Sequence, residues 1–330
     1  MATRLDFLRV RWGAKCGALK REMLRGVFRA DVGDLRHIDK VRQAARMSSV
    51  NRRAFLKKAA VAAAGTMLAG CNDNLLNLFN TGTEQLWGMN VHPFSGEIGS
   101  AQIEVLRLLG IRRIRMTLGL EDDLAGPYLQ GYSGAEYVGL VNDYSTTIPA
   151  AAAWPGLVRR AVERAPGLYC YEILNEPTDL TPAVYVEQYL RPAYEIIKGI
   201  NPSYQVAAAA PSGTSGGRLY FYQMTDAGAD SWCDVRAAHV YGETADLYLA
   251  GTTKPFLITE TGISDPASHV DWWSNTMTHT SAVLETDRLY FYDLADSGDS
   301  GFALISMNSR PGAIVALSPL YEYIRTRYGT

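Results

Sequence analysis

Residues 168–177 read Leu-Tyr-Cys-Tyr-Glu-Ile-Leu-Asn-Glu-Pro, a short and largely apolar run that ends in polar residues. A nearly continuous apolar run of this length is typical of a parallel strand that is buried on both faces. We therefore predict a strand over residues 168–175, whose carboxyl end presents Asn175 and Glu176. The fold follows from how often this pattern recurs along the chain.

Similar runs give eight candidate strands, at residues 86–91, 111–117, 139–143, 168–175, 205–210, 235–241, 255–259 and 301–307. Helical patterns lie between them, at residues 101–109, 157–164, 182–198, 219–227, 270–284 and 319–328. This alternation predicts an α/β fold, a single (β/α)8 barrel over residues 85–330. Barrels of this kind typically have about 250 residues. A doubly wound sheet is the alternative, and it is disfavoured because no glycine-rich phosphate-binding motif follows the first strand.

The longest predicted helix covers residues 182–198. Thr181 is its expected N-cap, Pro182 occupies the first helical position and Gly199 follows its end. Pro192 lies inside this helix and has no N–H to donate, so we expect a kink or a break there.

The overall charge hides an asymmetry. The 330-residue chain is 47% hydrophobic and 20% charged, which excludes a disordered or collagen-like protein, and its net charge is −2. Residues 1–70 contain 16 basic and 5 acidic residues, whereas residues 71–330 contain 16 basic and 29 acidic residues. Two oppositely charged segments indicate that the two parts of the chain have different roles.

The basic segment resembles a twin-arginine export signal. Residues 52–58 read Arg-Arg-Ala-Phe-Leu-Lys-Lys, and residues 59–70 are uncharged and rich in alanine and glycine. This run is too short to span a bilayer, which needs about 20 apolar residues. It fits the apolar core of a signal peptide, which we assign to residues 47–70. The alternative is a buried alanine-rich helix with a chance arginine pair.

Leu68-Ala69-Gly70-Cys71 resembles a bacterial lipobox, which implies lipidation at Cys71 and cleavage just before it. We therefore expect a lipid-anchored protein of the bacterial cell envelope, periplasmic or on the outer surface, with a linker over residues 71–84. We expect translation to start at Met47 and residues 1–46 to be an untranslated extension. A basic arm for nucleic acid or anionic lipid is the alternative, but its basic residues show no regular alternation with aromatic ones.

Cysteines and histidines do not form a metal-binding pattern. Neither a Cys-x-x-Cys nor a His-x-His spacing occurs, so we expect no metal and no cofactor. Cys170 and Cys233 are expected to be two buried thiols, with a disulfide as the alternative.

The predicted strand ends carry the chemistry, because active sites of such barrels lie at the carboxyl ends of the strands. Glu176 follows the fourth strand and Glu260 the seventh, His239 and Tyr241 end the sixth, and Arg115 lies in the second. Glycoside cleavage uses one carboxylic acid to protonate the leaving oxygen and one carboxylate to attack the anomeric carbon. An arginine and a tyrosine hydroxyl would keep the attacking carboxylate ionised, and Arg115 and Tyr241 suit this role.

Asn-Glu-Pro at a strand end, His-x-Tyr on a later strand and a late strand-ending glutamate together resemble clan A of the glycoside hydrolases, such as families 5, 39 and 128. The resemblance covers the whole predicted barrel. It implies that Glu176 is the acid/base, Glu260 is the nucleophile and Asn175 contacts the sugar 2-hydroxyl. It also implies that His239, Tyr241 and Arg115 are binding-site residues, although Arg113 lies on the same strand face as Arg115.

The sequence departs from the clan at the predicted eighth strand. Many members carry a tryptophan there, whereas residues 305–309 read Ile-Ser-Met-Asn-Ser, which leaves Asn308 as the candidate contact. Further candidate substrate contacts are Trp273, after the seventh strand, and His92, after the first. Sugars stack on aromatic rings, although core packing is the ordinary role of such residues.

These features predict a monomeric, retaining hydrolase of β-linked oligo- or polysaccharides. The acidic barrel favours a neutral carbohydrate substrate and gives no sign of nucleic-acid binding. A glycan-binding barrel without activity is the alternative. A Schiff-base aldolase is disfavoured because Lys198 and Lys254 do not lie at strand ends.

Overall fold

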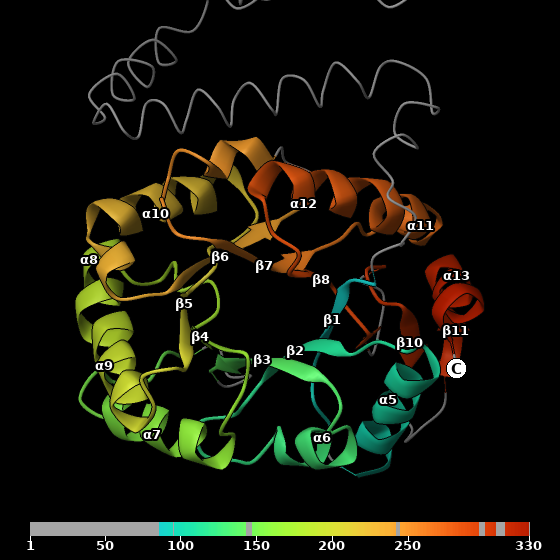
Figure 1. Cartoon of the computed structure of the whole chain (residues 1–330), viewed down its shortest axis with the longest axis horizontal. Helices are drawn as coiled ribbons and strands as arrows, with labels where there is room; N and C mark the ends of the chain where they lie inside the picture. Colours follow the sequence, from blue (N-terminus) through green and yellow to red (C-terminus); the bar gives the residue numbers. More distant parts are fainter. Residues whose placement is uncertain are drawn as a thin grey trace, which may run out of the picture. The chain divides into compact units, whose positions relative to one another are not determined.

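The computed structural model describes residues 86–94, 96–142, 147–241, 245–296, 301–307 and 314–329. Eight parallel strands close into a barrel in chain order (Figure 1). Closure is made by β1 and β8, which pair in parallel with Gly88 opposite Tyr290 and Met89 opposite Phe291. The predicted (β/α)8 barrel is therefore confirmed, and the doubly wound sheet is wrong because the sheet has no open edge. The predicted signal peptide, Cys71, the linker and Asn308 lie outside the described residues.

The barrel strands are β1 Gly88–Val91, β2 Arg113–Thr117, β3 Glu136–Val141, β4 Cys170–Ile173, β5 Gln205–Ala208, β6 Val235–Val240, β7 Phe256–Thr261 and β8 Leu289–Phe291. The helices around them are α5 Gly96–Leu108, α6 Gly126–Gly131, α7 Trp154–Arg164, α8 Pro182–Tyr185, α9 Arg191–Ile200, α10 Ser215–Asp226, α11 His269–Asp271, α12 Met277–Leu284 and α13 Pro319–Tyr328. None of the described helices is long and apolar enough to cross a bilayer.

The predicted eighth strand is wrong. Residues 301–307 do not enter the barrel; they contribute β10 Ile305–Met307 to a separate sheet with β9 Ala295–Asp296 and β11 Ile314–Leu317. Gly301 has a φ of +69°, which a strand does not tolerate. The barrel instead uses β8, whose three residues are all buried.

The helix predicted over residues 182–198 contains the expected interruption. The Thr181 hydroxyl caps its start by accepting from the Val184 N–H at 3.3 Å. A π-helical turn, η1 (Val186–Leu190), then separates α8 from α9, whose second residue is Pro192. Because proline offers no N–H and its ring clashes with the preceding turn, the wider π turn accommodates it.

A packed cluster of buried, mostly apolar residues fills part of the barrel interior. Its buried members are Val138, Cys170, Ala207, Ala210, Ala237, Leu257 and Tyr290. Cys170 and Cys233 are free, buried thiols, and burial raises the pKa of both. The polar groups that line the cavity described below lie toward the carboxyl ends of the strands.

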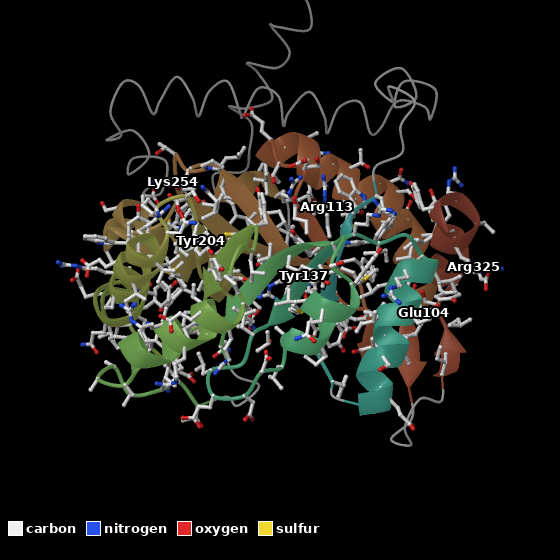
Figure 2. The ribbon with its side chains drawn as sticks, turned by 60° about the horizontal axis from the view of Figure 1, so that its bottom comes forward. Glu104, Arg113, Tyr137, Tyr204, Lys254 and Arg325 are labelled. Atoms are coloured by element: carbon white, nitrogen blue, oxygen red, sulfur yellow. The ribbon has the colours of Figure 1, made fainter. Side chains whose placement is uncertain are left out.

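Ion pairs and one tyrosine hold the amino-terminal ends of β2 and β3 in place. Arg113 Nη2 lies 3.3 Å from Asp287 Oδ2 and Arg288 Nε lies 2.9 Å from Glu136 Oε1, which join β2 and β3 to the start of β8. The Tyr137 hydroxyl donates to the carbonyls of Tyr128 and Tyr132 at 3.0 and 2.8 Å and ties β3 to α6; Arg113 and Tyr137 are labelled in Figure 2. Arg113 is therefore used for structure.

Candidate active site

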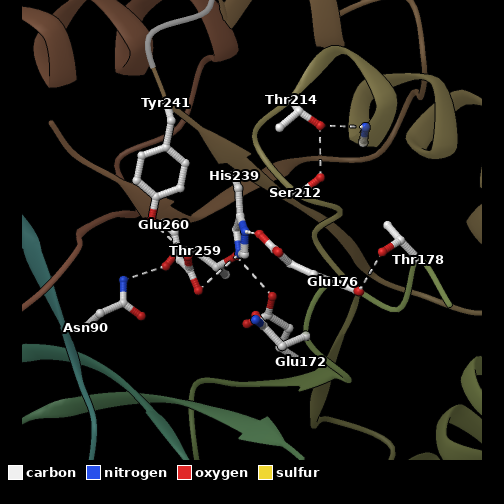
Figure 3. A network of polar contacts seen from close by, with 12 residues as sticks. Asn90, Glu172, Glu176, Thr178, Ser212, Thr214, His239, Tyr241, Thr259 and Glu260 are labelled. Atoms are coloured by element: carbon white, nitrogen blue, oxygen red, sulfur yellow. Dashed lines mark hydrogen bonds and ion pairs between the residues drawn. The ribbon is translucent and has the colours of Figure 1, made fainter. Parts of the chain in front are cut away.

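A cavity of about 230 Å³ opens at the carboxyl ends of the barrel strands. Five residues that the sequence singled out line it, namely His92, Arg115, Asn175, Glu176 and Glu260. His239 contacts Glu176, and the Tyr241 hydroxyl donates to Glu260 (Figure 3). The cavity therefore brings together the residues that separate strand ends were expected to supply.

Glu176 reaches the cavity through an unusual backbone path after β4. Leu174 and Glu176 have φ values of +63° and +44°, which residues with a side chain rarely adopt. The Glu176 N–H donates to the Ala210 carbonyl at 3.1 Å, and the Pro177 carbonyl accepts from the Tyr220 hydroxyl at 2.9 Å. Such conformations persist only where surrounding contacts impose them. The result is a carboxylate that remains 36% exposed at the cavity wall.

Glu260, at the end of β7, lies in a much more enclosed position. Its Oε1 accepts from Arg115 Nη1 at 2.7 Å and its Oε2 accepts from the Tyr241 hydroxyl at 2.8 Å. Burial opposes ionisation, but His239, Arg115 and the Tyr241 hydrogen bond outweigh it and hold the pKa of Glu260 below its ordinary value. Glu260 is therefore held in its ionised form.

Arg115 orients the polar floor of the cavity. Besides Glu260, its guanidinium donates from Nε to Glu172 Oε2 at 2.7 Å, from Nη1 to Asn90 Oδ1 at 2.9 Å and from Nη2 to Asn175 Oδ1 at 2.8 Å. The two carboxylates more than offset the burial of the guanidinium and raise its pKa. Arg115 is thus a fixed cation whose nitrogens are all committed to protein partners.

Glu172, which the sequence did not single out, supports Arg115 from inside the barrel. It is fully buried inside β4 and also accepts from the Thr259 hydroxyl at 3.0 Å. Sequence reasoning considered only the strand ends, and Glu172 lies within the strand. The available signal was a single charged residue in an apolar strand, since a buried charge requires a partner.

His239 lies between the two cavity glutamates. Its Nδ1 is 2.7 Å from Glu176 Oε1 and its Nε2 is 3.4 Å from Glu260 Oε1. Its side chain has no exposed surface, so the prediction that His239 contacts the substrate directly is wrong. The imidazole instead connects the two carboxylates.

Aromatic residues gather on the other side of Glu260. The Tyr241 ring lies 6.3 Å from the Tyr292 ring and 5.7 Å from the Phe302 ring, and the Tyr292 hydroxyl lies 3.1 Å from His92 Nε2. Tyr292 directly follows β8 and joins Asp293 through a cis peptide bond. The sequence reasoning missed Tyr292 because it placed the eighth strand elsewhere.

Trp273 does not line the cavity, so this prediction is wrong. Its side chain is 1% exposed, its ring lies 6.0 Å from that of Phe291 and its carbonyl accepts from Trp87 Nε1 at 2.9 Å. The residue lies in a helical turn, η5 (Trp272–Thr276), and not in the loop after β7. The turn directs the ring into the core between the helices and β8.

Glu176, His239 and Glu260 could in principle share a cation, because one ligand atom from each lies within 4.8 Å of the others. Arg115, however, donates to the same Glu260 oxygen that faces His239. A metal ion there would compete with the guanidinium for this oxygen and would be repelled by its charge. The set fits proton chemistry better than metal binding.

Comparison with known proteins finds solved structures with a similar fold. No protein-family model and no curated protein matches the chain. The catalytic domain of the GH30 xylanase C from Talaromyces cellulolyticus matches with a TM-score of 0.50 and 11% identity, over 72% of this chain and 75% of that one.

Two further similar structures have slightly lower scores. A GH128 subgroup II endo-β-1,3-glucanase from Sorangium cellulosum matches with a TM-score of 0.49 and 17% identity, over 73% of this chain and 99% of that one. A GH30 endoxylanase from Clostridium papyrosolvens matches with a TM-score of 0.49 and 14% identity, over 74% and 72%. All three are glycoside hydrolases, and at these identities the likeness shows the barrel fold alone.

Proposed function

We propose that this protein is a retaining glycoside hydrolase that cleaves a β-linked oligo- or polysaccharide. The observation that carries the proposal is the pair Glu176 and Glu260. They follow different strands, face one cavity and bring carboxylate oxygens within 4.8 Å of each other. Retaining enzymes hold their carboxyl groups about 5–5.5 Å apart, whereas inverting enzymes need about 6.5–9.5 Å to admit a water molecule. The spacing supports double displacement.

In the first step, Glu260 attacks the anomeric carbon and forms a glycosyl ester while the bond to the leaving oxygen breaks. Glu176 delivers its proton to that oxygen, so the leaving group departs as an alcohol. In the second step, the ionised Glu176 takes a proton from water, which attacks the anomeric carbon and releases Glu260 as a carboxylate. The enclosed position and lowered pKa of Glu260 suit the nucleophile, and the exposed Glu176 suits proton exchange with water.

His239 supports this assignment of roles. Its imidazole contacts Glu176 through Nδ1 and faces Glu260 through Nε2, so it holds the two carboxylates on either side of one ring.

The decisive experiment is an assay on a glycan panel that includes xylan, β-1,3-glucan, mixed-linkage glucan and mannan, with proton NMR of the first-formed product anomer. We expect a β-anomeric product from a β-linked substrate. An α-anomeric first product would exclude double displacement. Binding without new reducing ends would favour the glycan-binding barrel.

Variants of the two glutamates test the assignment directly. Glu176→Gln and Glu260→Gln should each reduce kcat by several orders of magnitude with unchanged circular dichroism. Azide should restore turnover to Glu260→Gly with an inverted product and to Glu176→Gly with a retained product. Full activity in either Gln variant would contradict the assignment.

We also propose that the protein is exported through the twin-arginine route and anchored by lipid at Cys71, which would place the barrel in the bacterial cell envelope. This proposal rests on the order of the motifs in residues 52–71 and not on the barrel.

A further inference from the structure

The cavity offers no free positive charge to a ligand among the described residues. Its charged lining residues are Arg115, Glu176, Asp179 and Glu260. Every guanidinium nitrogen of Arg115 already donates to Glu172, Glu260, Asn90 or Asn175. The two cavity glutamates and Asp179 therefore dominate the electrostatic field that a substrate meets.

The histidines do not change this balance. His92 lines the cavity, but its Nε2 lies 3.6 Å from Asp293 Oδ2, a carboxylate that is 1% exposed. A proton on His92 would be neutralised by Asp293. His239 lies between Glu176 and Glu260, so a proton there is likewise shared with carboxylates.

Asp179 differs from the other carboxylates because it has no protein partner. It lies in the turn after β4, where Leu180 N–H donates to the Pro177 carbonyl at 3.1 Å. Its side chain is exposed, and it makes no hydrogen bond or ion pair with the residues that the structure describes. It shares its turn with Glu176, the group that protonates the leaving oxygen in the proposed mechanism. Asp179 therefore faces the leaving-group side.

We infer that the cavity selects uncharged glycans and that Asp179 rejects anionic substituents, such as uronate or sulfate, on the leaving-group side. An anionic group entering there would lose water without gaining a cation and would meet an unpaired carboxylate. The other lining residues are uncharged, which suits neutral sugars. They comprise apolar side chains (Val91, Met116, Leu140, Ile148 and Leu174) and amide or hydroxyl side chains (Asn90, Thr117, Asn142 and Asn175). This inference rests on the proposed glycosidase activity.

The test compares two derivatives of the same polymer that differ in charge but little in size. Hydroxyethyl and carboxymethyl forms of β-1,3-glucan, and of xylan, are prepared at matched substitution. For each variant, the ratio of kcat/KM on the carboxymethyl form to that on the hydroxyethyl form is measured at low ionic strength. We expect a ratio below one for the native protein. It should rise about two- to fivefold in Asp179→Asn and further in Asp179→Lys, as expected for one exposed charge.

A matched control separates this local effect from the net charge of the protein. Asp226 is exposed at the end of α10 and lines neither cavity, so Asp226→Asn should leave the ratio unchanged. Added salt should reduce the difference between native protein and Asp179→Asn. A native ratio of one or more, or a ratio that neither Asp179 variant moves, would overturn the inference. If no polymer is cleaved at all, the proposed activity fails instead.

Discussion

Besides His239 and Arg115, Tyr241 helps to keep Glu260 ionised through a single hydrogen bond. Its hydroxyl donates to Glu260 Oε2 and so stabilises the ionised form of the carboxylate, which lowers the pKa of Glu260. In Tyr241→Phe the pKa of Glu260 should rise, and the acid limb of kcat/KM should move to higher pH. The expected loss in kcat/KM at neutral pH is about tenfold or more, as for the removal of a hydrogen bond to a charged group. Kinetics from pH 3 to 8 measure both effects; an unmoved acid limb would show that the hydroxyl does not tune Glu260.

His239 should matter most for substrates whose leaving group needs a proton. Because its Nδ1 contacts Glu176, replacement by asparagine should impair proton delivery, which contributes about 10²- to 10⁴-fold to such reactions. Substrates with a dinitrophenolate leaving group need no proton, so their cleavage should fall much less. The comparison of alkyl and dinitrophenyl glycosides distinguishes this role from a structural one. Equal losses on both substrates would mean that His239 merely supports the fold of the site.

Most candidate site residues were predictable because a residue type and a strand end coincided. Glu176 and Glu260 fulfil that condition, whereas Arg115 was recognised as a charge inside the second strand. His239 fulfils it too, but its full burial between two carboxylates depends on distances that no sequence spacing contains. Glu172 lies inside its strand and Tyr292 follows a strand of only three residues.

At the scale of elements, the loop after β5 holds Tyr241 in place. A Cβ on Gly213 would lie 2.6 Å from Tyr241 Cδ2 and 3.3 Å from the Tyr241 backbone nitrogen. Gly213→Ala should therefore displace the ring and weaken its bond to Glu260, with a loss in kcat similar to that of Tyr241→Phe. Gly216→Ala is the matched control, because the nearest atom to its added Cβ is 3.7 Å away.

The double variant shows whether Gly213 acts through the Tyr241 hydroxyl. If it does, Gly213→Ala should cost little in a Tyr241→Phe background, so the two effects should not add. Additive losses in kcat would place the effect of Gly213 elsewhere in the loop.

The elements were predictable to the extent that they are local. The barrel strands β1–β7 overlap the predicted runs because each is a largely apolar stretch of buried residues. β8 was not predicted because Leu289-Tyr290-Phe291 is short. Its place in the barrel depends on pairing with β1, about 200 residues away in the sequence. Barrel closure is a non-local requirement that local hydrophobicity does not encode.

At the scale of the whole molecule, the opposite charges of the two segments have separate explanations. The acidic residues belong to the segment that contains the barrel, whose cavity presents carboxylates and no free cation among its described lining residues. The basic residues belong to the segment proposed to direct export. A mature protein without residues 1–70 would therefore carry a strong negative charge instead of the near-neutral total.

Cell fractionation tests the proposed anchor. When the full chain is expressed in a bacterium with a twin-arginine pathway, activity should appear in the membrane fraction as a shortened, lipid-modified protein. Cys71→Ser should prevent lipidation, so the protein should leave the membrane fraction. The joint change Arg52→Lys and Arg53→Lys should instead retain a full-length, active precursor in the cytoplasm, because the described barrel begins well after the signal. If Cys71→Ser remains in the membrane fraction with the native mass, the residues before the barrel do not form a lipoprotein signal, and the buried alanine-rich helix becomes the better interpretation.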